Sequence, residues 1–190
     1  MKRGELVYLQ AIEREDLKPL MKWRNLESFK KHFREYREIN LEMQEDWYQK
    51  NVINDPSTLM FSIKRILDDE LLGCCGLCYI NWVHRHADLS LYIGYQEEYI
   101  DTKGYAKESC NLLFEYGFNQ LGLNKIWTEI YEFDHKKKYL YDQLGFQLDG
   151  VLRNQYFYEG RWWNSYLLSL LKDEFSQSNT IKKLNEGDLL

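Results

Sequence analysis

The 190-residue chain lacks the features of several protein classes. It contains only 2 Pro and 11 Gly, while 44% of its residues are hydrophobic, which excludes collagen-like and disordered chains. Its longest apolar stretch without charge, residues 71–83, is shorter than the roughly 20 residues of a membrane-spanning helix. No apolar signal-peptide region follows residues 1–5. We therefore predict one cytoplasmic domain, residues 1–173, without membrane contact, followed by a polar tail, 174–190.

Metal ligands and positive charge are also scarce. Cys75 and Cys78 match a C-x-x-C spacing, but residues three apart in a strand point to opposite faces, so we expect free thiols and no metal site. The formal net charge of −5 argues against binding to nucleic acid. We interpret the lysines at 136–138 as a solvated helix face.

Strand and helix signals alternate along the chain. Residues 26–40 are the exception, because they are rich in aromatic and charged side chains without a clear period, and we expect a binding loop there. Asp88 lies on the polar face of an alternating strand that we expect to border a cleft. The expected strands are 6–12, 58–66, 71–83, 87–94, 125–131, 151–158 and 162–171, and the expected helices are 13–25, 41–51, 102–121 and 134–144.

The loop that precedes the third of these helices has the character of an anion site. Backbone N–H groups at a helix start are unsatisfied and carry partial positive charge, which favours phosphate. Gly104 permits close approach of the backbone to a ligand. The residues concerned are Asp101, Thr102, Lys103, Gly104, Tyr105, Ala106 and Lys107.

Two motifs together carry a family resemblance. The stretch 103–106 (KGYA) opens a long helix, and Tyr141-x-x-Leu144-Gly145-Phe146 follows after a further strand. At this spacing the chain resembles, over about residues 6–171, the GCN5-related N-acetyltransferases (GNAT), in the branch of ribosomal-protein N-terminal acetyltransferases and spermidine acetyltransferase. The resemblance implies an α/β (α+β) fold with a mixed, twisted and splayed sheet of about seven strands and flanking helices.

The resemblance also implies acetyl-CoA as cosubstrate, wedged in the opening of the sheet. Its pyrophosphate would rest on the loop 101–107, and its pantetheine would pair with backbone at Leu91, Tyr92 and Ile93. Asp134 matches a position where the family has Asn. Many relatives form dimers, so the resemblance is consistent with a homodimer.

The implied reaction is direct acetyl transfer to a primary amine. The family's general acid matches Tyr141, a phenol that donates a proton to the departing thiolate. For the base, Asp88 is the first candidate and Glu129 the second, with deprotonation through bulk water as a further alternative. A polyamine, an amino sugar and a protein amino terminus all stay open as acceptors. We expect aromatic walls from the carboxy-terminal hairpin: Tyr156, Tyr158, Trp162 and Trp163.

Three departures from the family pattern support an alternative function. Asp101 places an acid in the phosphate loop, Asp134 replaces an amide donor, and the link 94–100 is about three residues longer than usual. A noncatalytic CoA-binding sensor or an oligomeric interaction protein with the same fold would tolerate these changes. Retention of Tyr141 favours the enzyme.

Overall fold

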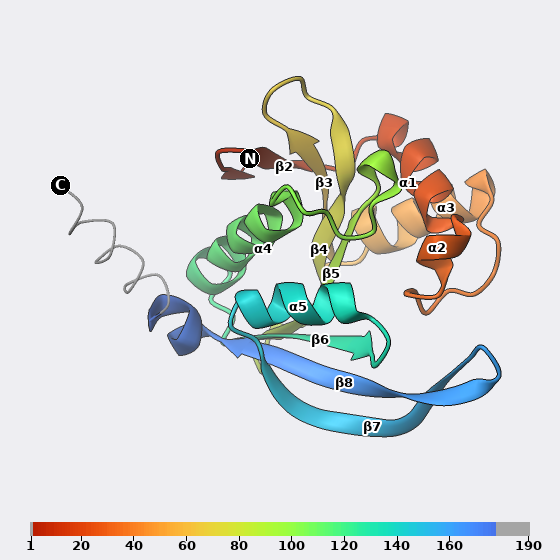
Figure 1. The fold of residues 1–190 in the computed structure, drawn as a ribbon. Coiled ribbons are helices and arrows are strands. Elements are labelled where there is room, and N and C mark those ends of the chain that lie inside the picture. The colour runs from red at the N-terminus through yellow and green to blue at the C-terminus, as the bar shows by residue number, and fades with distance from the viewer. Residues whose placement is uncertain (1, 178–190) are drawn as a thin grey trace.

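One mixed sheet organises the protein, as the computed structural model shows for residues 2–177 (Figure 1). The strand order is β1-β2-β3-β4-β5-β6-β8-β7, and every pairing is antiparallel except that of β5 with β6. The predicted mixed sheet is therefore confirmed. The strands are β1 Lys2–Arg3, β2 Val7–Ala11, β3 Leu59–Arg65, β4 Leu71–Asn81, β5 His86–Ile93, β6 Lys125–Tyr131, β7 Gln147–Tyr158 and β8 Arg161–Leu171.

The two parallel strands separate soon after they meet. Their register runs only from His86 opposite Lys125 to Asp88 opposite Trp127. Beyond that point β5 continues along β4 and β6 continues along β8, so an opening forms between them. The hydroxyl of Thr128 donates a 3.3 Å hydrogen bond to the carbonyl of Leu89 at its narrow end. This is the splay that the resemblance implied.

The helices lie at the faces and one end of the sheet. In Figure 1, α4 and α5 lie across the front, while α1, α2 and α3 gather beside one end. Among residues 2–177, no helix is long and apolar enough to cross a membrane. The α-helices are α1 Leu17–Arg24, α2 Glu27–Lys30, α3 Leu41–Trp47, α4 Tyr105–Glu115 and α5 His135–Gln143, and π-helical turns extend α3 (Tyr48–Ile53) and α4 (Tyr116–Gln120).

The region 26–40 is more ordered than the predicted loop. It contains the short helix α2, whose Phe29 side chain is fully buried. The ring of Phe29 packs edge-on against Tyr99, with 5.5 Å between the ring centroids. Ile39 is also buried, and Leu26 and Phe33 pack against the core, so apolar side chains without a regular period fix this segment.

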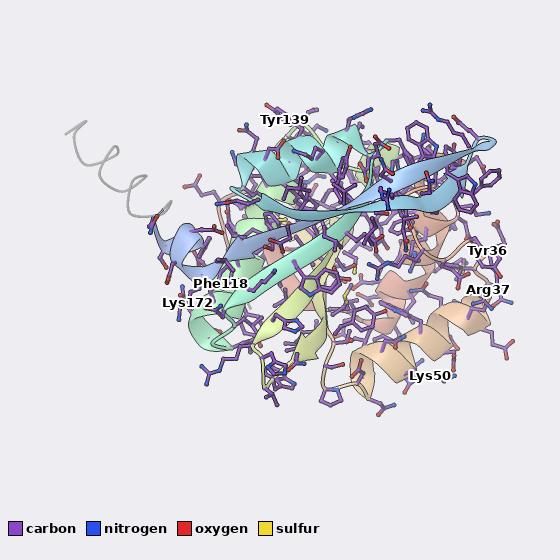
Figure 2. The ribbon with its side chains drawn as sticks, turned by 90° about the horizontal axis from the view of Figure 1, so that it is seen from below. Tyr36, Arg37, Lys50, Phe118, Tyr139 and Lys172 are labelled. Carbon is purple, nitrogen blue, oxygen red and sulfur yellow. The ribbon has the colours of Figure 1, made fainter. Side chains whose placement is uncertain are left out.

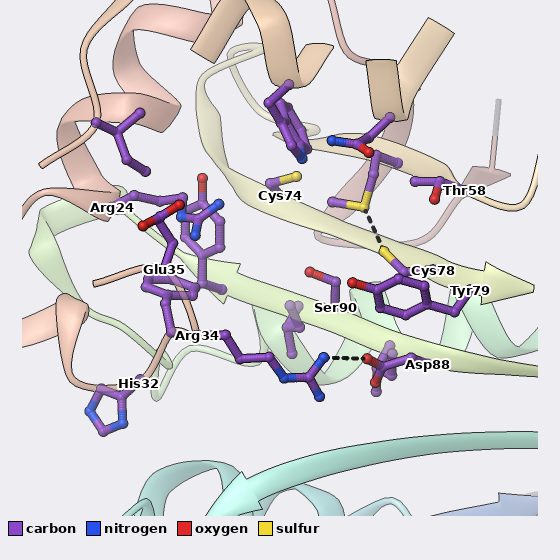
Figure 3. Close-up of a pocket in the computed structure, with 18 of the residues that line it drawn as sticks. Arg24, His32, Arg34, Glu35, Thr58, Cys74, Cys78, Tyr79, Asp88 and Ser90 are labelled. Carbon is purple, nitrogen blue, oxygen red and sulfur yellow. Dashed lines mark hydrogen bonds and ion pairs between the residues drawn. The ribbon is translucent and has the colours of Figure 1, made fainter. Parts of the chain in front are cut away.

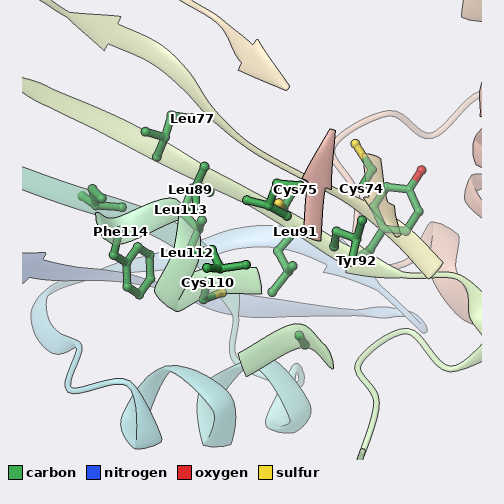
Figure 4. Packing of buried hydrophobic residues seen from close by; sticks show 14 of the residues in the cluster. Cys74, Cys75, Leu77, Leu89, Leu91, Tyr92, Cys110, Leu112, Leu113 and Phe114 are labelled. Carbon is green, nitrogen blue, oxygen red and sulfur yellow. The ribbon is translucent and has the colours of Figure 1, made fainter. Parts of the chain in front are cut away.

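The main core lies between β4, β5 and α4. Leu77 and Leu91 pack with Leu113 of α4 in the buried cluster of Figure 4. The opposite face of β5 meets α1, because the hydroxyl of Tyr92 donates to the carbonyl oxygen of Leu20. The alternation predicted for β5 thus supports helices on both faces. All four cysteines are free thiols: Cys74, Cys75, Cys78 and Cys110.

The start of the predicted polar tail belongs to this core. Residues 172–177 form a helical turn, and Phe175 is buried beside Phe118, with 5.3 Å between the ring centroids. A single apolar side chain was too weak a signal to predict this packing. The remainder of the tail, 178–190, lies outside the described residues.

We expect Gly94→Ala to destabilise the protein by about 2–3 kcal/mol, because a Cβ atom at Gly94 would lie 1.8 Å from Cδ2 of Trp23. Urea unfolding measures this as a lower transition midpoint. Gly150→Ala is the control, since nothing lies within 4 Å of its added Cβ, and its midpoint should barely move. Equal midpoints for both variants would contradict the tight contact between Gly94 and α1.

Candidate active site

A cavity of about 590 Å³ opens where β5 and β6 separate. Its walls come from the end of α1, residues 32–39, α3, β4, β5, β6 and α5. Figure 3 shows the side chains from these elements that converge on it. Sequence segments far apart in the chain therefore meet at one place.

Both candidates for the base border this cavity and share one cation. Arg34 Nη1 lies 3.5 Å from Oδ2 of Asp88, and Arg34 Nη2 lies 3.1 Å from Oε2 of Glu129 (Figure 3 shows the first pair). Burial raises the pKa of Asp88 to about 6, although the positive charges of Arg34 and Lys137 oppose the shift. Asp88 therefore changes its protonation state close to neutral pH.

Tyr141 lies behind this cavity. Its side chain is fully buried on α5, and its ring packs on Phe146 with 5.1 Å between the centroids. The hydroxyl forms no well-aligned hydrogen bond with any described residue. Burial raises the pKa of Tyr141 well above its ordinary value. The phenol is close to the opening of the sheet but is not part of the cavity wall.

Lys137 corrects the interpretation of the lysine run. Lys136 is exposed and Lys138 pairs with Asp142 at 2.5 Å, as expected for a solvated helix face. The side chain of Lys137, in contrast, is only 9% exposed and lines the cavity. It precedes Tyr141 by four residues, so both side chains lie on one face of α5. That spacing was the signal that could have identified it.

Asp134 caps α5. Its Oδ1 accepts the backbone N–H of Lys137 at 3.0 Å, and its Oδ2 accepts the hydroxyl of Tyr99 at 3.3 Å. The Nδ1 atom of His32 lies 3.2 Å from the same Oδ2. Burial would raise the pKa of Asp134, but His32 and Lys137 outweigh it and hold the pKa below its usual value. His32, which we did not predict, thus connects the 26–40 region to α5.

The loop 101–107 has its own internal anion. The carboxylate of Asp101 accepts backbone N–H groups of Lys103, Tyr105 and Ala106 at 2.8, 2.9 and 2.7 Å. Gly104 adopts a φ of 95° directly before α4. Asp101 therefore satisfies several of the backbone donors that the resemblance assigns to pyrophosphate.

Other members of the loop remain accessible to a phosphate. Thr102, Lys103 and Lys107 are exposed. The Lys103 ammonium donates to the side-chain oxygen of Gln96 in the longer link, at 2.5 Å. Two lysine charges thus lie on the loop that also carries Asp101.

The backbone of β5 faces the opening at alternate residues. Leu89 accepts from Thr128, and the N–H of Ile93 donates to the carbonyl of Tyr99 at 3.0 Å, so Leu91 between them also directs its backbone into the opening. The N–H of Gly94 donates instead to the carbonyl of Leu72 of β4 at 2.7 Å, so Tyr92, two residues earlier, directs its backbone towards β4. Among the three predicted pantetheine contacts, Leu91 has the most open backbone edge.

The hairpin aromatics are placed differently from our expectation. Tyr156, Tyr158, Trp162 and Trp163 are absent from the cavity wall within residues 2–177. Tyr156 instead stacks on Tyr131, which does line the cavity, with 4.0 Å between the centroids. Arg37, which lines the cavity, and its neighbour Tyr36 lie at the outer edge of the molecule (Figure 2). The hairpin therefore supports the wall from behind.

Potential metal ligands do not gather in the described part of the chain. No group of three or more His, Cys, Asp or Glu side chains is arranged there to hold an ion. Burial raises the pKa of Cys78, the most accessible thiol of its cluster, to about 12. Charged side chains thus supply the polar chemistry of the cavity.

Comparisons with known proteins identify the family and the fold. Residues 9–167 match the family model described as the acetyltransferase (GNAT) domain. Spermidine N(1)-acetyltransferase of Escherichia coli (strain K12) is 31% identical over 92% of this chain and 91% of its own. The crystal structure of spermidine N-acetyltransferase from Vibrio cholerae in complex with CoA and spermine superposes with a TM-score of 0.80 at 26% identity, covering 89% of this chain and 97% of that one.

We expect Asp101→Asn to lower the free energy of unfolding by about 1–2 kcal/mol, because a charged helix cap is lost. The same change should tighten CoA binding at least about threefold, because a negative charge leaves the phosphate loop. Urea unfolding and calorimetric titration measure the two effects. Glu115→Gln, exposed at the other end of α4, is the control. Weaker CoA binding by Asp101→Asn would mean that the cap organises the site.

Proposed function

The chain belongs to the GNAT acetyltransferase family and is an acetyl-CoA-dependent N-acetyltransferase, and we propose that its acceptor is a primary amine of a polyamine. The observation that carries the proposal is the guanidinium of Arg34 between Asp88 and Glu129. Two carboxylates at the narrow end of the cavity thus already bind one cation. An aliphatic ammonium group has the same charge and fits the same pair of acceptors.

The rest of the cavity suits a second positive charge. Three further acidic side chains line it, Glu35, Asp46 and Asp55, and a polyamine carries ammonium groups at intervals along one flexible chain. Arg37 pairs with Glu35 at 2.6 Å, so this wall already binds a cation of the protein. Relatives named for spermidine that match most of the chain support the same acceptor class.

Asp88 is the base of the proposed reaction. An ammonium group must lose a proton before it attacks, and a buried carboxylate that titrates near neutral pH is suited to accept it. Arg34 must leave Asp88 when the acceptor arrives, because both cations need the same oxygens. Glu129 then remains to pair either with the displaced Arg34 guanidinium or with an ammonium group of the acceptor.

Acetyl-CoA supplies the activated acetyl group, and three parts of the chain would hold it. The loop 101–107 offers the α4 terminus and two lysines for phosphates. The backbone of β5 from Leu91 to Ile93 offers hydrogen bonds along the opening, with Asp134 supporting the neighbouring end of α5. Tyr141 is the proton donor for the sulfur in this proposal.

Self-association and a cytoplasmic location complete the proposal. A structural neighbour from Vibrio cholerae is described as dodecameric, and the β7–β8 hairpin exposes apolar side chains, including Phe157 and Trp162. The four free thiols fit a reducing compartment. Analytical ultracentrifugation tests the self-association. A protein that sediments as a monomer throughout the micromolar range would exclude it.

The test of the acceptor is thiol release from acetyl-CoA with spermidine, spermine, amino-terminal peptides and an amino sugar. We expect kcat/KM to be at least about tenfold higher for the polyamines.

Arg34→Gln should lower KM for a polyamine several-fold, because the competing cation is gone. Arg153→Gln, exposed on β7, is the control. Preference for a peptide or sugar would overturn the polyamine, and CoA binding without any release would favour the sensor.

Asp88→Asn should reduce turnover at least about tenfold, equivalent to ~1.4 kcal/mol in the barrier. For a base that must be deprotonated, the wild-type rate falls as the pH drops through about 6, the pKa of Asp88, and the variant should lose this limb. The pH dependence of kcat/KM for acetyl-CoA measures it. Asp142→Asn, exposed on α5, should retain the limb. An unchanged limb in Asp88→Asn would assign it to another group.

A further inference from the structure

We propose that Lys137 is a second catalytic residue, whose ammonium group stabilises the thiolate that leaves when the acetyl group is transferred. The inference rests on the acetyl-CoA chemistry of the family and is independent of the acceptor. It starts from the position of Lys137 on the inner face of α5, one turn before Tyr141 and in the cavity wall.

The side chain is buried without a partner of its own. Within residues 2–177, Lys137 Nζ forms no hydrogen bond and no ion pair within 4.0 Å. It makes a cation–π contact with the ring of Tyr99, at 5.1 Å from the ring centroid. A buried ammonium group without a close anion is costly in free energy. A structural lysine would close that deficit inside the protein, whereas a binding lysine leaves it for a ligand.

The charged groups around Lys137 are two carboxylates and one guanidinium. Asp134 faces it from the start of α5, Asp88 from β5, Cys110 from α4 and Arg34 from the loop after α2. Burial lowers the pKa of Lys137 below its usual value, while Asp134 and Asp88 oppose the shift. The two carboxylates thus favour the charged form without forming a direct ion pair with it.

The reaction needs such a charge. Asp88 first takes one proton from the ammonium group and passes it to solvent. When the neutral amine nitrogen then bonds to the acetyl carbon, the carbon–sulfur bond breaks and its electron pair stays on sulfur, while the second proton of the nitrogen goes to Asp88. The negative charge on sulfur then needs a cation or a proton. Tyr141 donates its proton to sulfur only late, because burial raises its pKa well above the ordinary value, so the negative charge on sulfur must be stabilised until that transfer. The ammonium of Lys137, on the same helix face and open to the cavity, offsets the charge directly.

A binding measurement tests the contact without turnover. Desulfo-CoA lacks the sulfur, so the ratio of CoA to desulfo-CoA affinity reports what the sulfur gains. If Lys137 stabilises the thiolate, this ratio should rise at least about tenfold as the pH rises from about 6 towards the ordinary thiol pKa of about 8.5, since binding favours the ionised form. The ultraviolet absorbance of the thiolate should appear in the CoA complex.

Matched variants assign the effect to one ammonium group. Lys137→Met should abolish the rise of the ratio and the thiolate absorbance, and Lys137→Arg, which keeps the charge, should retain much of both. Lys138→Met, the half-buried neighbour that pairs with Asp142, is the control and should behave as the wild type. A ratio in Lys137→Met that rises as in the wild type would overturn the proposal.

Turnover and stability separate a catalytic lysine from a structural one. Lys137→Met should lower kcat about 30- to 100-fold with little change in KM for acetyl-CoA. Its urea midpoint should stay equal or rise, because an unpaired buried charge is removed. Lys137 would be structural if Lys137→Met had a lower urea midpoint and both Lys137→Met and Lys137→Arg kept the pH dependence of the CoA to desulfo-CoA affinity ratio. An acetyl adduct on Lys137 during turnover would also overturn the role, because acetylation removes the charge.

Discussion

The short parallel pairing between β5 and β6 is the constraint on which the rest of the molecule depends. Three residue pairs join the strands before each follows a different antiparallel neighbour. A longer parallel ladder would close the sheet and satisfy the backbone of Leu91. Because the ladder stops at Asp88, its carboxylate stands at the narrow end of the opening, and α5 can direct side chains into the space beyond.

Three carboxylates around this opening each contact a basic side chain of the protein. Arg34 bridges Asp88 and Glu129, while Asp134 is held by His32 and the start of α5. Arg34 and His32 both come from the 26–40 region, which forms part of the cavity wall. The protein thereby avoids the cost of isolated buried charge in the free state and still offers the same oxygens to an incoming cation.

Local patterns predicted the elements, and contacts distant in sequence decided the details of the site. Alternation along β5 identified Asp88 correctly as a cavity residue, and the helix-start motif located the loop of Asp101. Lys137 was missed because three consecutive lysines are typical of a solvated face, and only the packing of α5 against the sheet separates the middle one. Arg34 could not be assigned either, since its partners are more than fifty residues away along the chain.

The contact between His32 and Asp134 joins two segments that are far apart in the sequence. One partner belongs to the segment beside the acceptor cavity, and the other caps the helix that carries Tyr141. A ligand that shifts either end changes the free energy of the other, and this linkage is reciprocal by thermodynamic necessity. A displacement in the 26–40 region therefore reaches the start of α5 through a single imidazole–carboxylate contact.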